Sequence, residues 1–349
     1  IVILSEINDY DDIEKVAQKI LGLFQTPINI KNYEHEISTS IGISVYPDIG
    51  EDMDVLLRSA DIALYRAKDR GRDRYQFFDE DMKQDLHKKL SLEKDLRSAI
   101  RLQQLKLLYQ PYIDLKTNKV VGAEALIRWD HPTLGLLSPN EFISLAEETG
   151  LIITIGNWVI KKACKQIRAW KKLGNPLSVS INLSAKQLAG NNLVNSIRES
   201  LDTYNVEPKY LELEITESIA MQNKEQTSSK LKELVDMGMS ITMDDFGTGY
   251  SSLSYLKGFH VQKIKIDQSF VKDVNRDPQD AAIVRTIISM GHTLGLKVCA
   301  EGIETTKQKN FLTAVNCDAG QGFLVCKPVE AEKLWVWNQN RNLVLNTQS

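Results

Sequence analysis

Residues 177–216, LSVSINLSAKQLAGNNLVNSIRESLDTYNVEPKYLELEIT, contain the pattern of one strand, one helix and a second strand. The apolar runs at 177–182 and 211–216 are short and bounded by polar residues, which predicts buried strands. Residues 193–204 have the apolar spacing of an amphipathic helix. Because two strands joined through a helix usually run parallel, this unit predicts a parallel sheet with helices packed on it.

The alternation of strands and helices continues on both sides of this unit. We predict strands at 105–109, 120–129, 177–182, 211–216, 240–244, 263–266, 297–300 and 319–322, with helices at 139–149, 155–173, 193–204, 224–237, 279–294 and 306–313. Eight strands at this spacing favour an α/β fold closed into a TIM-like (β/α)8 barrel over an open doubly wound sheet. Only a short turn near Thr117 and Asn118 separates the first two strands, so we expect an antiparallel first strand.

Residues 1–79 predict a separate and incomplete α/β segment. Strands are expected at 1–4, 37–46 and 74–78, and helices at 11–24 and 53–68, which is too little for a complete α/β domain. Residues 80–102 are charged and lack Gly and Pro, so they predict a helical connector, and we assign the barrel domain to residues 91–340. The chain begins at Ile1 inside a predicted strand, so we expect a fragment.

The composition is that of a globular protein, with 42% hydrophobic and 26% charged residues. A net charge of -3 does not provide the positive electrostatic field through which proteins bind long nucleic acid. A small anionic ligand is still compatible with this charge. No apolar run reaches the roughly 18 residues of a membrane helix. The cysteines form no C-x-x-C pair, so we expect reduced thiols and a cytoplasmic protein, with an upstream tether to a membrane or sensor region left open. They are Cys164, Cys299, Cys317 and Cys326.

Acidic and amide side chains recur on or just after the predicted barrel strands, where catalytic groups of such barrels cluster. They are Glu124, Asn182, Glu214, Asp244, Asp245, Asp267, Glu301 and Gln321, accompanied by Lys265. A single acid at a strand end is usually exposed or paired with a lysine, but a group of mutually repelling carboxylates needs a cation. Oxygen ligands without a His or Cys cluster select Mg²⁺ or Mn²⁺ over zinc. The sequence therefore predicts a two-metal, phosphodiester-cleaving site.

Two features of this set carry further predictions. Asp244 and Asp245 are adjacent and are followed by Gly247 and Gly249, which would let the backbone turn so that both acids approach one metal pair. Lys265, at an inward-facing strand position, is either a buried counter-ion or a phosphate contact, and the two interpretations are compatible. We expect Lys265→Ala to lower the rate of phosphodiester cleavage more than it lowers the stability of the fold.

Seven motifs occur in order along the barrel: EALIRW at 124–129, NLS at 182–184, EITE at 214–217, DDFGTGY at 244–250, KID at 265–267, AEGIE at 300–304 and GQG at 320–322. Together they resemble the EAL family of cyclic di-GMP-specific phosphodiesterases, over residues 91–329. The resemblance implies two divalent cations per site. The implied ligands are Glu124, Asn182, Glu214 and Asp244 for the first metal, and Asp244, Asp245 and Glu301 for the second.

The resemblance also implies roles for other positions. Glu124, Lys265, Glu301 and Gln321 would be catalytic, with Lys265 orienting or deprotonating a water and contacting phosphate. Substrate contacts would come from Leu126, Arg128, Asn182 and Asp267. Glu217 would hold the loop at 244–250 in place. A homodimer is implied, with its contact near residues 246–252.

The N-terminal segment has its own resemblance, carried by SIGIS at 40–44, ADIALYRAK at 60–68 and GRDR at 71–74. These stretches are similar to the C-terminal half of a GGDEF, or diguanylate cyclase, domain. The half with the signature loop, the metal aspartate and the guanine pocket is not in this sequence. Lys68 and Arg72 match positions that contact GTP phosphates, but here solvated cations at a helix end are the favoured interpretation.

The function expected from these resemblances is metal-dependent hydrolysis of cyclic di-GMP to linear pGpG. Three alternatives stay open at this point. They are a barrel that binds cyclic di-GMP without cleaving it, a diguanylate cyclase, and an unrelated barrel metalloenzyme that acts on another phosphodiester.

Overall fold

The computed structural model describes residues 1–5, 7, 9–25, 28–30, 33–35, 37–174, 176–221, 224–247 and 258–347. The chain divides into two compact units, Ile1–Lys94 and Asp95–Ser349, and the division falls within helix α3 (Glu80–Ala99). None of the helices in this described part combines the length and apolar character that crossing a bilayer requires.

The second unit is built on a closed sheet of eight strands. The order around the barrel is β5 (Leu105–Asp114), β13 (Ala319–Gly320), β12 (Lys297–Ala300), β11 (Lys263–Ile266), β10 (Ser240–Phe246), β9 (Leu211–Thr216), β8 (Ser178–Asn182) and β6 (Val120–His131). Pairing of β6 with β5 closes the ring, and β5 runs antiparallel to both of its neighbours. The predicted TIM-like barrel and its antiparallel first strand are confirmed. A short strand that was not predicted, β7 (Gly135–Leu137), extends β6 at the edge.

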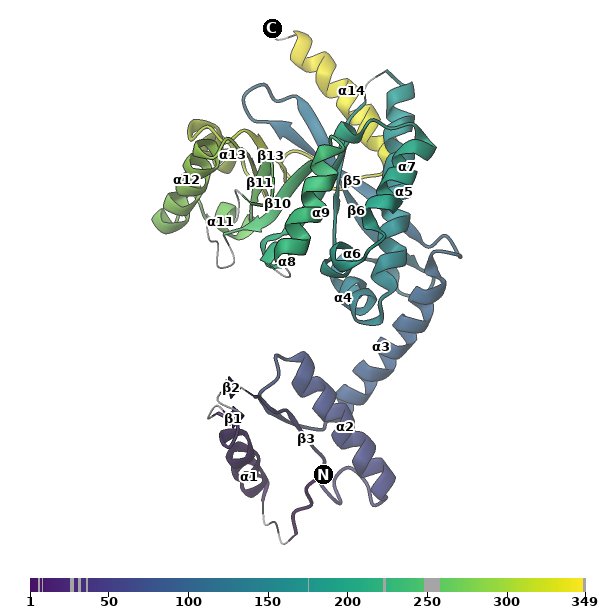
Figure 1. Ribbon diagram of the computed structural model, residues 1–349, viewed down its shortest axis with the longest axis vertical. Helices are drawn as coiled ribbons and strands as arrows, with labels where there is room; N and C mark the ends of the chain where they lie inside the picture. The colour runs from purple at the N-terminus through teal and green to yellow at the C-terminus, as the bar shows by residue number, and fades with distance from the viewer. Residues whose placement is uncertain are drawn as a thin grey trace. The chain divides into compact units, whose positions relative to one another are not determined.

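Helices cover the outside of the barrel (Figure 1). The longer ones are α4 (Pro139–Thr149), α5 (Leu151–Lys172), α7 (Leu193–Tyr204), α9 (Lys224–Asp236), α12 (Pro278–Thr293), α13 (Thr306–Ala314) and α14 (Ala331–Thr347). Local signals set their ends: α4 begins with a capping box between Ser138 and Glu141 and ends at Gly150, whose φ is 77°. Three short helices, α6 (Ala185–Ala189), α8 (Glu217–Met221) and α11 (Gln268–Lys272), begin within a few residues of the carboxyl ends of β8, β9 and β11. A 3-10 turn, η1 (Pro208–Tyr210), precedes β9.

Both faces of the central strands are buried, but with different side chains. On β9, Leu211 and Leu213 are fully buried on the side that faces the helices, as the alternation of a strand requires. The intervening Glu212 and Glu214 are buried on the opposite side, inside the barrel. The interior of a (β/α)8 barrel is usually filled with branched aliphatic side chains. This barrel instead encloses a set of charged groups.

The first unit contains α1 (Tyr10–Gly22), β1 (Ile28–Ile30), β2 (Tyr33–His35), β3 (Ile41–Ile43), α2 (Met53–Asp69) and β4 (Tyr75–Phe77). Strands β3 and β4 pair in parallel, and α2 packs so closely on them that a Cβ at Gly42 would lie 2.0 Å from the carbonyl oxygen of Ala60. The strand predicted at 1–4 is wrong. These residues form no strand, and Ile1 is fully exposed. A strand needs a hydrogen-bonding neighbour, and the described part of the first unit gives these residues none. The strand predicted at 37–46 is reduced to β3.

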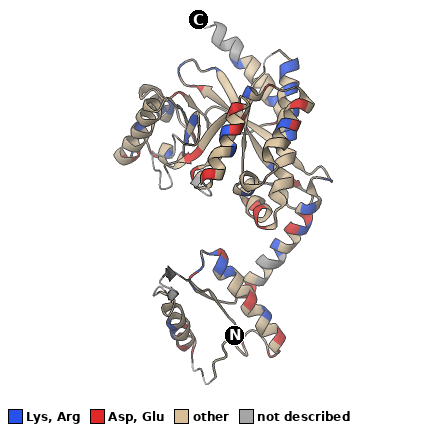
Figure 2. Cartoon of the chain, in the orientation of Figure 1, with Lys and Arg blue, Asp and Glu red and all other residues tan. Residues whose placement is uncertain are grey.

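Charged residues of both signs are intermixed on α7 and α9, whereas the charged residues of α5 are all basic (Figure 2). This distribution agrees with a net charge of only -3. The dense acidic group of this unit lies instead inside the barrel.

Candidate metal centre

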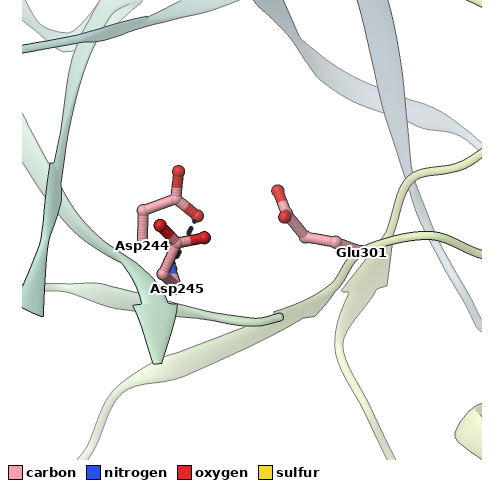
Figure 3. A group of neighbouring side chains, drawn as sticks. All are labelled: Asp244, Asp245 and Glu301. Carbon is pink, nitrogen blue, oxygen red and sulfur yellow. Dashed lines mark hydrogen bonds between the residues drawn. The ribbon is translucent and has the colours of Figure 1, made fainter. Parts of the chain in front are cut away.

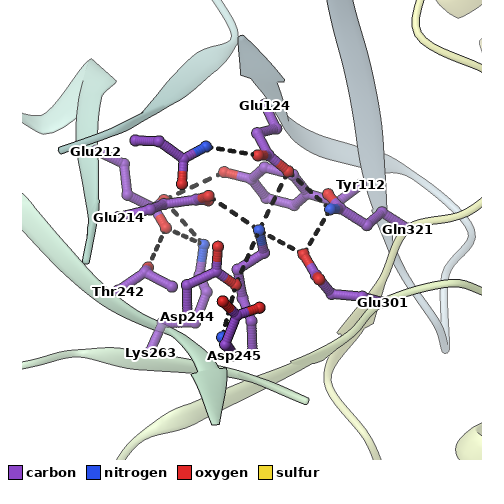
Figure 4. Close-up of polar contacts among 12 residues, drawn as sticks. Tyr112, Glu124, Glu212, Glu214, Thr242, Asp244, Asp245, Lys263, Glu301 and Gln321 are labelled. Carbon is purple, nitrogen blue, oxygen red and sulfur yellow. Dashed lines mark hydrogen bonds and ion pairs between the residues drawn. The ribbon is translucent and has the colours of Figure 1, made fainter. Parts of the chain in front are cut away.

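The acidic residues that the sequence places at strand ends converge inside the barrel (Figure 4). Glu124 comes from β6, Glu214 from β9 and Asp244 from β10, and Glu301 follows β12 directly. Because β6, β8, β9, β10, β11 and β12 run parallel, their carboxyl ends lie at one end of the barrel and bring these side chains together. Glu214 is only 2% exposed and Glu124 only 5%. Such deeply buried carboxylates require compensation by a cation.

Lys265, on β11, provides one such cation at the centre of the group. Its Nζ lies 2.5 Å from Glu301 Oε1, 2.9 Å from Glu214 Oε2, 3.1 Å from Glu124 Oε2 and 3.4 Å from Asp244 Oδ1. Its side chain is 3% exposed, so water does little to screen these contacts. Four carboxylates around a single ammonium still leave an excess of negative charge.

Two amide side chains complete the network. Asn182 Nδ2 donates a hydrogen bond of 2.8 Å to Glu124 Oε1. Gln321 Nε2 donates to Glu124 Oε2 and to Glu301 Oε1, each at 2.8 Å. The Oε1 atom of Gln321 is buried and has no hydrogen-bond partner among the described residues. A buried acceptor of this kind is ordinarily satisfied by a water or a ligand.

Asp244 and Asp245 lie in a β-bulge that turns both carboxylates toward Glu301 (Figure 3). The pairing of β10 with β11 gains an extra residue between Met243 and Phe246, and Asp245 has a φ of 53°. One carboxylate oxygen from each of Asp244, Asp245 and Glu301 lies within 4.8 Å of the others, a spacing that could hold one metal ion. From the sequence, the backbone turn was expected at Gly247 and Gly249. In the structure it begins earlier, at Asp245.

The electrostatics of the group favour binding of a further cation. Burial raises the pKa of Glu301 to about 8, and burial together with the Glu124 carboxylate raises the pKa of Glu214 well above its ordinary value. Burial also raises the pKa of Asp244. With Lys265 as the only central cation among the described residues, the group therefore retains protons near neutral pH. A divalent cation would displace them.

The pKa of Glu124 is lowered and the pKa of Lys265 is raised, so both groups keep their charge. Burial would raise the pKa of Glu124, but the ammonium of Lys265 and the hydrogen bonds from Gln321 and Asn182 together hold it below its ordinary value. Burial would lower the pKa of Lys265, yet the surrounding carboxylates, Glu124 foremost, hold it well above its usual range. The result is a fixed ion pair in the middle of the group.

The donor atoms that converge here suit a hard divalent cation. They are carboxylate oxygens, which Mg²⁺ and Mn²⁺ prefer, whereas Asn182 and Gln321 direct their amide nitrogens at the carboxylates. The excess negative charge and the raised pKa values of Glu301 and Glu214 point the same way.

Other residues singled out from the sequence lie around this group. Leu126 and Arg128 follow Glu124 at alternate positions of β6 and are partly buried, and Arg128 Nη1 donates to the carbonyl oxygen of Ile127 at 2.8 Å. Asp267 caps helix α11, accepting a hydrogen bond of 2.9 Å from the backbone N–H of Ser269.

Glu217 begins helix α8 and is buried, and its Oε2 atom has no hydrogen-bond partner among the described residues. Residues 248–257 lie outside the described residues. The predicted contact of Glu217 with the loop at 244–250, and most of the dimer contact predicted near 246–252, therefore fall outside them.

A second buried polar group was not predicted. Glu212 of β9 binds Lys263 of β11, Thr242 of β10 and Tyr112 of β5, and all four appear in Figure 4. The sequence did contain a signal for it. Glu212 precedes Glu214 by two residues and Lys263 precedes Lys265 by two, so each pair shares one face of its strand.

Comparison with known proteins identifies the family. The sequence-family model of the EAL domain matches residues 93–328, more than half of the chain. This chain belongs to the EAL domain family. The model of the diguanylate cyclase GGDEF domain matches residues 1–74, ahead of the EAL domain. Both resemblances inferred from the motifs are confirmed.

Curated relatives contain the EAL domain within longer chains. The bifunctional diguanylate cyclase/cyclic di-GMP phosphodiesterase MucR of Pseudomonas aeruginosa is 44% identical over 334 residues, which cover 95% of this chain and 49% of MucR. The cyclic di-GMP phosphodiesterase PdeR of Escherichia coli is 38% identical over 336 residues, 96% of this chain and 51% of PdeR. The chain thus spans about half the length of these relatives.

Solved EAL structures have the same fold. The PaMucR phosphodiesterase in complex with c-di-GMP superposes with a TM-score of 0.68 at 46% sequence identity, over 70% of this chain and 99% of that one. The FimX EAL domain from Pseudomonas aeruginosa, bound to c-di-GMP, has a TM-score of 0.64 at 25% identity, over 68% of this chain and 96% of that one.

Proposed function

We propose that the EAL unit is a metal-dependent phosphodiesterase that hydrolyses cyclic di-GMP to linear pGpG. The observation that carries the proposal is the convergence of Glu124, Glu214, Asp244 and Glu301 on one buried point at the carboxyl ends of the strands. Relatives named as cyclic di-GMP phosphodiesterases and EAL structures in complex with c-di-GMP support the choice of substrate.

Two Mg²⁺ or Mn²⁺ ions fit the donor set. Asp244, Asp245 and Glu301 would hold one ion, since their oxygens already lie within 4.8 Å of one another. Glu124, Asn182 and Glu214 would hold the other and share Asp244 with the first. Bound divalent cations would polarise the phosphodiester and lower the pKa of a water.

The reaction forms one bond and breaks another at the same phosphorus. A water oxygen attacks the phosphorus, the bond from phosphorus to the 3′-oxygen breaks, and that oxygen takes up a proton, which leaves a 5′-phosphate on the linear product. Lys265 would orient or deprotonate the attacking water and contact the phosphate, because its ammonium lies at the centre of the proposed ligands. Gln321 would use its unpartnered Oε1 to accept from that water.

Substrate contacts are proposed on the same side of β6. Leu126 and Arg128 follow Glu124 at alternate positions, so they extend from the group of carboxylates toward the end of that strand. Arg128 is partly buried and presents a guanidinium that suits a phosphate oxygen of the dinucleotide. Asn182 and Asp267 are the further proposed contacts.

The test is a product assay on the purified chain. Cyclic di-GMP is incubated with protein in Mn²⁺, in Mg²⁺ and in a chelator, and nucleotides are separated by chromatography. We expect pGpG with either cation and none with chelator, and loss of turnover in Glu124→Gln. The matched control is Glu207→Gln, because Glu207 is an exposed carboxylate paired with Lys171 on the surface of the same unit. Binding of cyclic di-GMP without pGpG in the parent protein would contradict the proposal.

The wider assignments are proposals of the same kind. We propose that the barrel domain comprises residues 91–340 and that residues 1–79 form part of a GGDEF domain joined to it through the connector at 80–102. Incubation of this chain with GTP should give no cyclic product. A cytoplasmic homodimer is also proposed, and sedimentation of the purified chain would test the dimer.

A further inference from the structure

A second layer of polar side chains lies beneath the proposed metal ligands. Glu212 precedes Glu214 by two residues on β9, and Lys263 precedes Lys265 by two on β11. Residues two apart on a strand share a face and are separated by about 7 Å along it. Both lower residues therefore point into the barrel, one step toward the amino ends of the strands. Thr242, two residues before the Asp244 ligand of β10, lies in the same layer.

The lower layer is closely connected. Lys263 Nζ lies 2.7 Å from Glu212 Oε1 and 2.8 Å from Oε2, so one ammonium spans both carboxylate oxygens. The hydroxyl of Thr242 donates to Oε1, and the hydroxyl of Tyr112 donates to Oε2 at 3.2 Å. The ammonium of Lys263 also lies 4.5 Å from the centre of the Tyr112 ring. A Cβ at Gly122 would lie 2.2 Å from the Tyr112 hydroxyl, so this glycine leaves the space that the ring occupies.

Stability alone does not account for this arrangement. Replacing a buried ion pair by well-packed apolar side chains is often neutral or stabilising, and other (β/α)8 barrels fill this space with branched aliphatic residues. What the pair provides is a fixed charge distribution directly below an acid-rich layer. Glu212 holds the ammonium of Lys263 with both oxygens, and Lys263 cancels the charge that Glu212 would otherwise add beneath Glu214.

We propose that Glu212 and Lys263 are positioning residues that set the charge beneath the metal ligands, with Tyr112 and Thr242 fixing the geometry of the pair. This inference rests on the proposed metal centre. Because the charges of Glu212 and Lys263 cancel, the intact pair leaves the affinity of the site for divalent cations nearly unchanged. An unpaired Lys263 below the ligands weakens cation binding, and an unpaired Glu212 strengthens it.

The test uses Mn²⁺ alone as the probe. The full chain, stripped of metal, is titrated with Mn²⁺, and the free ion is measured from its paramagnetic resonance signal for the parent, Glu212→Gln, Lys263→Met and the double variant. We expect Glu212→Gln to weaken binding and Lys263→Met to strengthen it. A unit charge acting on a divalent ion over about 7 Å changes affinity by about eightfold even at the dielectric constant of water. The double variant, which removes both charges, should return to within about threefold of the parent.

Changes of Mn²⁺ affinity in opposite directions in the two single variants would separate a charge effect from damage to the fold, because damage would weaken binding in both. Glu207→Gln, which removes the same charge from an exposed pair, should leave Mn²⁺ affinity unchanged. If Lys263→Met fails to fold, recovery of Mn²⁺ affinity in the double variant relative to Glu212→Gln still decides the question. Weakening in both single variants with no recovery in the double variant, or no change in any, would overturn the inference while leaving the metal centre intact. Absence of Mn²⁺ binding in the parent would contradict the metal centre itself.

Discussion

Replacing Lys265 by methionine should destabilise the metal-free barrel strongly. Methionine keeps most of the side-chain volume but removes the ammonium that lies within 3.4 Å of four carboxylates. Removing one partner of a buried ion pair typically lowers the free energy of unfolding by about 3–5 kcal/mol. For a unit as long as Asp95–Ser349 the entropy of unfolding is roughly 0.5 kcal/mol per kelvin, so the Tm should fall by about 6–10 °C.

The measurement is thermal unfolding of parent and Lys265→Met at pH 8, near the pKa of Glu301, first in chelator and then in Mn²⁺. Bound Mn²⁺ supplies positive charge to the same carboxylates, so the difference in Tm should shrink when it is present. Lys171→Met is the control, because its partner Glu207 is exposed and the pair should contribute less than about 1 kcal/mol. An unchanged Tm in chelator, or an equal loss with and without Mn²⁺, would refute the reasoning. The sequence predicts that loss of Lys265 affects the rate more than folding. The four carboxylates around its ammonium instead indicate a large effect on folding as well.

Three further results are expected. Because the pKa of Glu301 is raised by burial from 4.5 to about 8, the folded metal-free protein binds more protons than the unfolded chain between these values. Its free energy of unfolding should therefore fall as pH rises toward 8, by up to about 1.4 kcal/mol per pH unit for one proton, and denaturant unfolding of Glu301→Gln should show a flatter slope. Gly302→Ala should lower both stability and Mn²⁺ affinity by displacing Glu301, since Gly302 has a φ of 66° and a Cβ there would lie 2.6 Å from Gln268 Cβ; normal affinity would contradict this. Gly122→Ala should cost about 1–3 kcal/mol in denaturant unfolding because its methyl group would overlap Tyr112, and a neutral effect would mean that the ring moves freely.

The barrel could be predicted because its signals are local and periodic. The apolar runs at 177–182 and 211–216 became β8 and β9, and the turn at Thr117 and Asn118 gave the antiparallel pairing of β5 with β6. Asn118 has a φ of 58°, a conformation that suits asparagine in a tight turn. The convergence of Glu124 with Glu301 followed from strand direction alone, since parallel strands bring their carboxyl ends together.

Other features depend on contacts that a local pattern does not contain. The positive φ of Asp245 arises from a bulge between two strands, so its carboxylate could be placed near Asp244 only roughly from the sequence. Ile1 and its neighbours have the composition of a strand, but the described part of the first unit gives them no strand to pair with. Helix α14 was missed because its apolar residues are spread around the helix rather than along one face.

The buried pair of Glu212 and Lys263 shows a different limit. Charged residues at alternate positions of a strand usually indicate a solvated face, so each of these side chains alone is more typical of a surface. Only the closed barrel, in which both sides of β9 and β11 are buried, turns the same pattern into an interior ion pair.

The measurement that tests the central claim most directly is hydrolysis of cyclic di-GMP in heavy-oxygen water, with Mn²⁺ and the purified parent chain, followed by mass spectrometry of the product. The proposed function predicts linear pGpG with one heavy oxygen on its 5′-phosphate, and no product from Glu124→Gln. Intact cyclic di-GMP after incubation with a folded, Mn²⁺-loaded parent protein, or pGpG without the heavy oxygen, would contradict it.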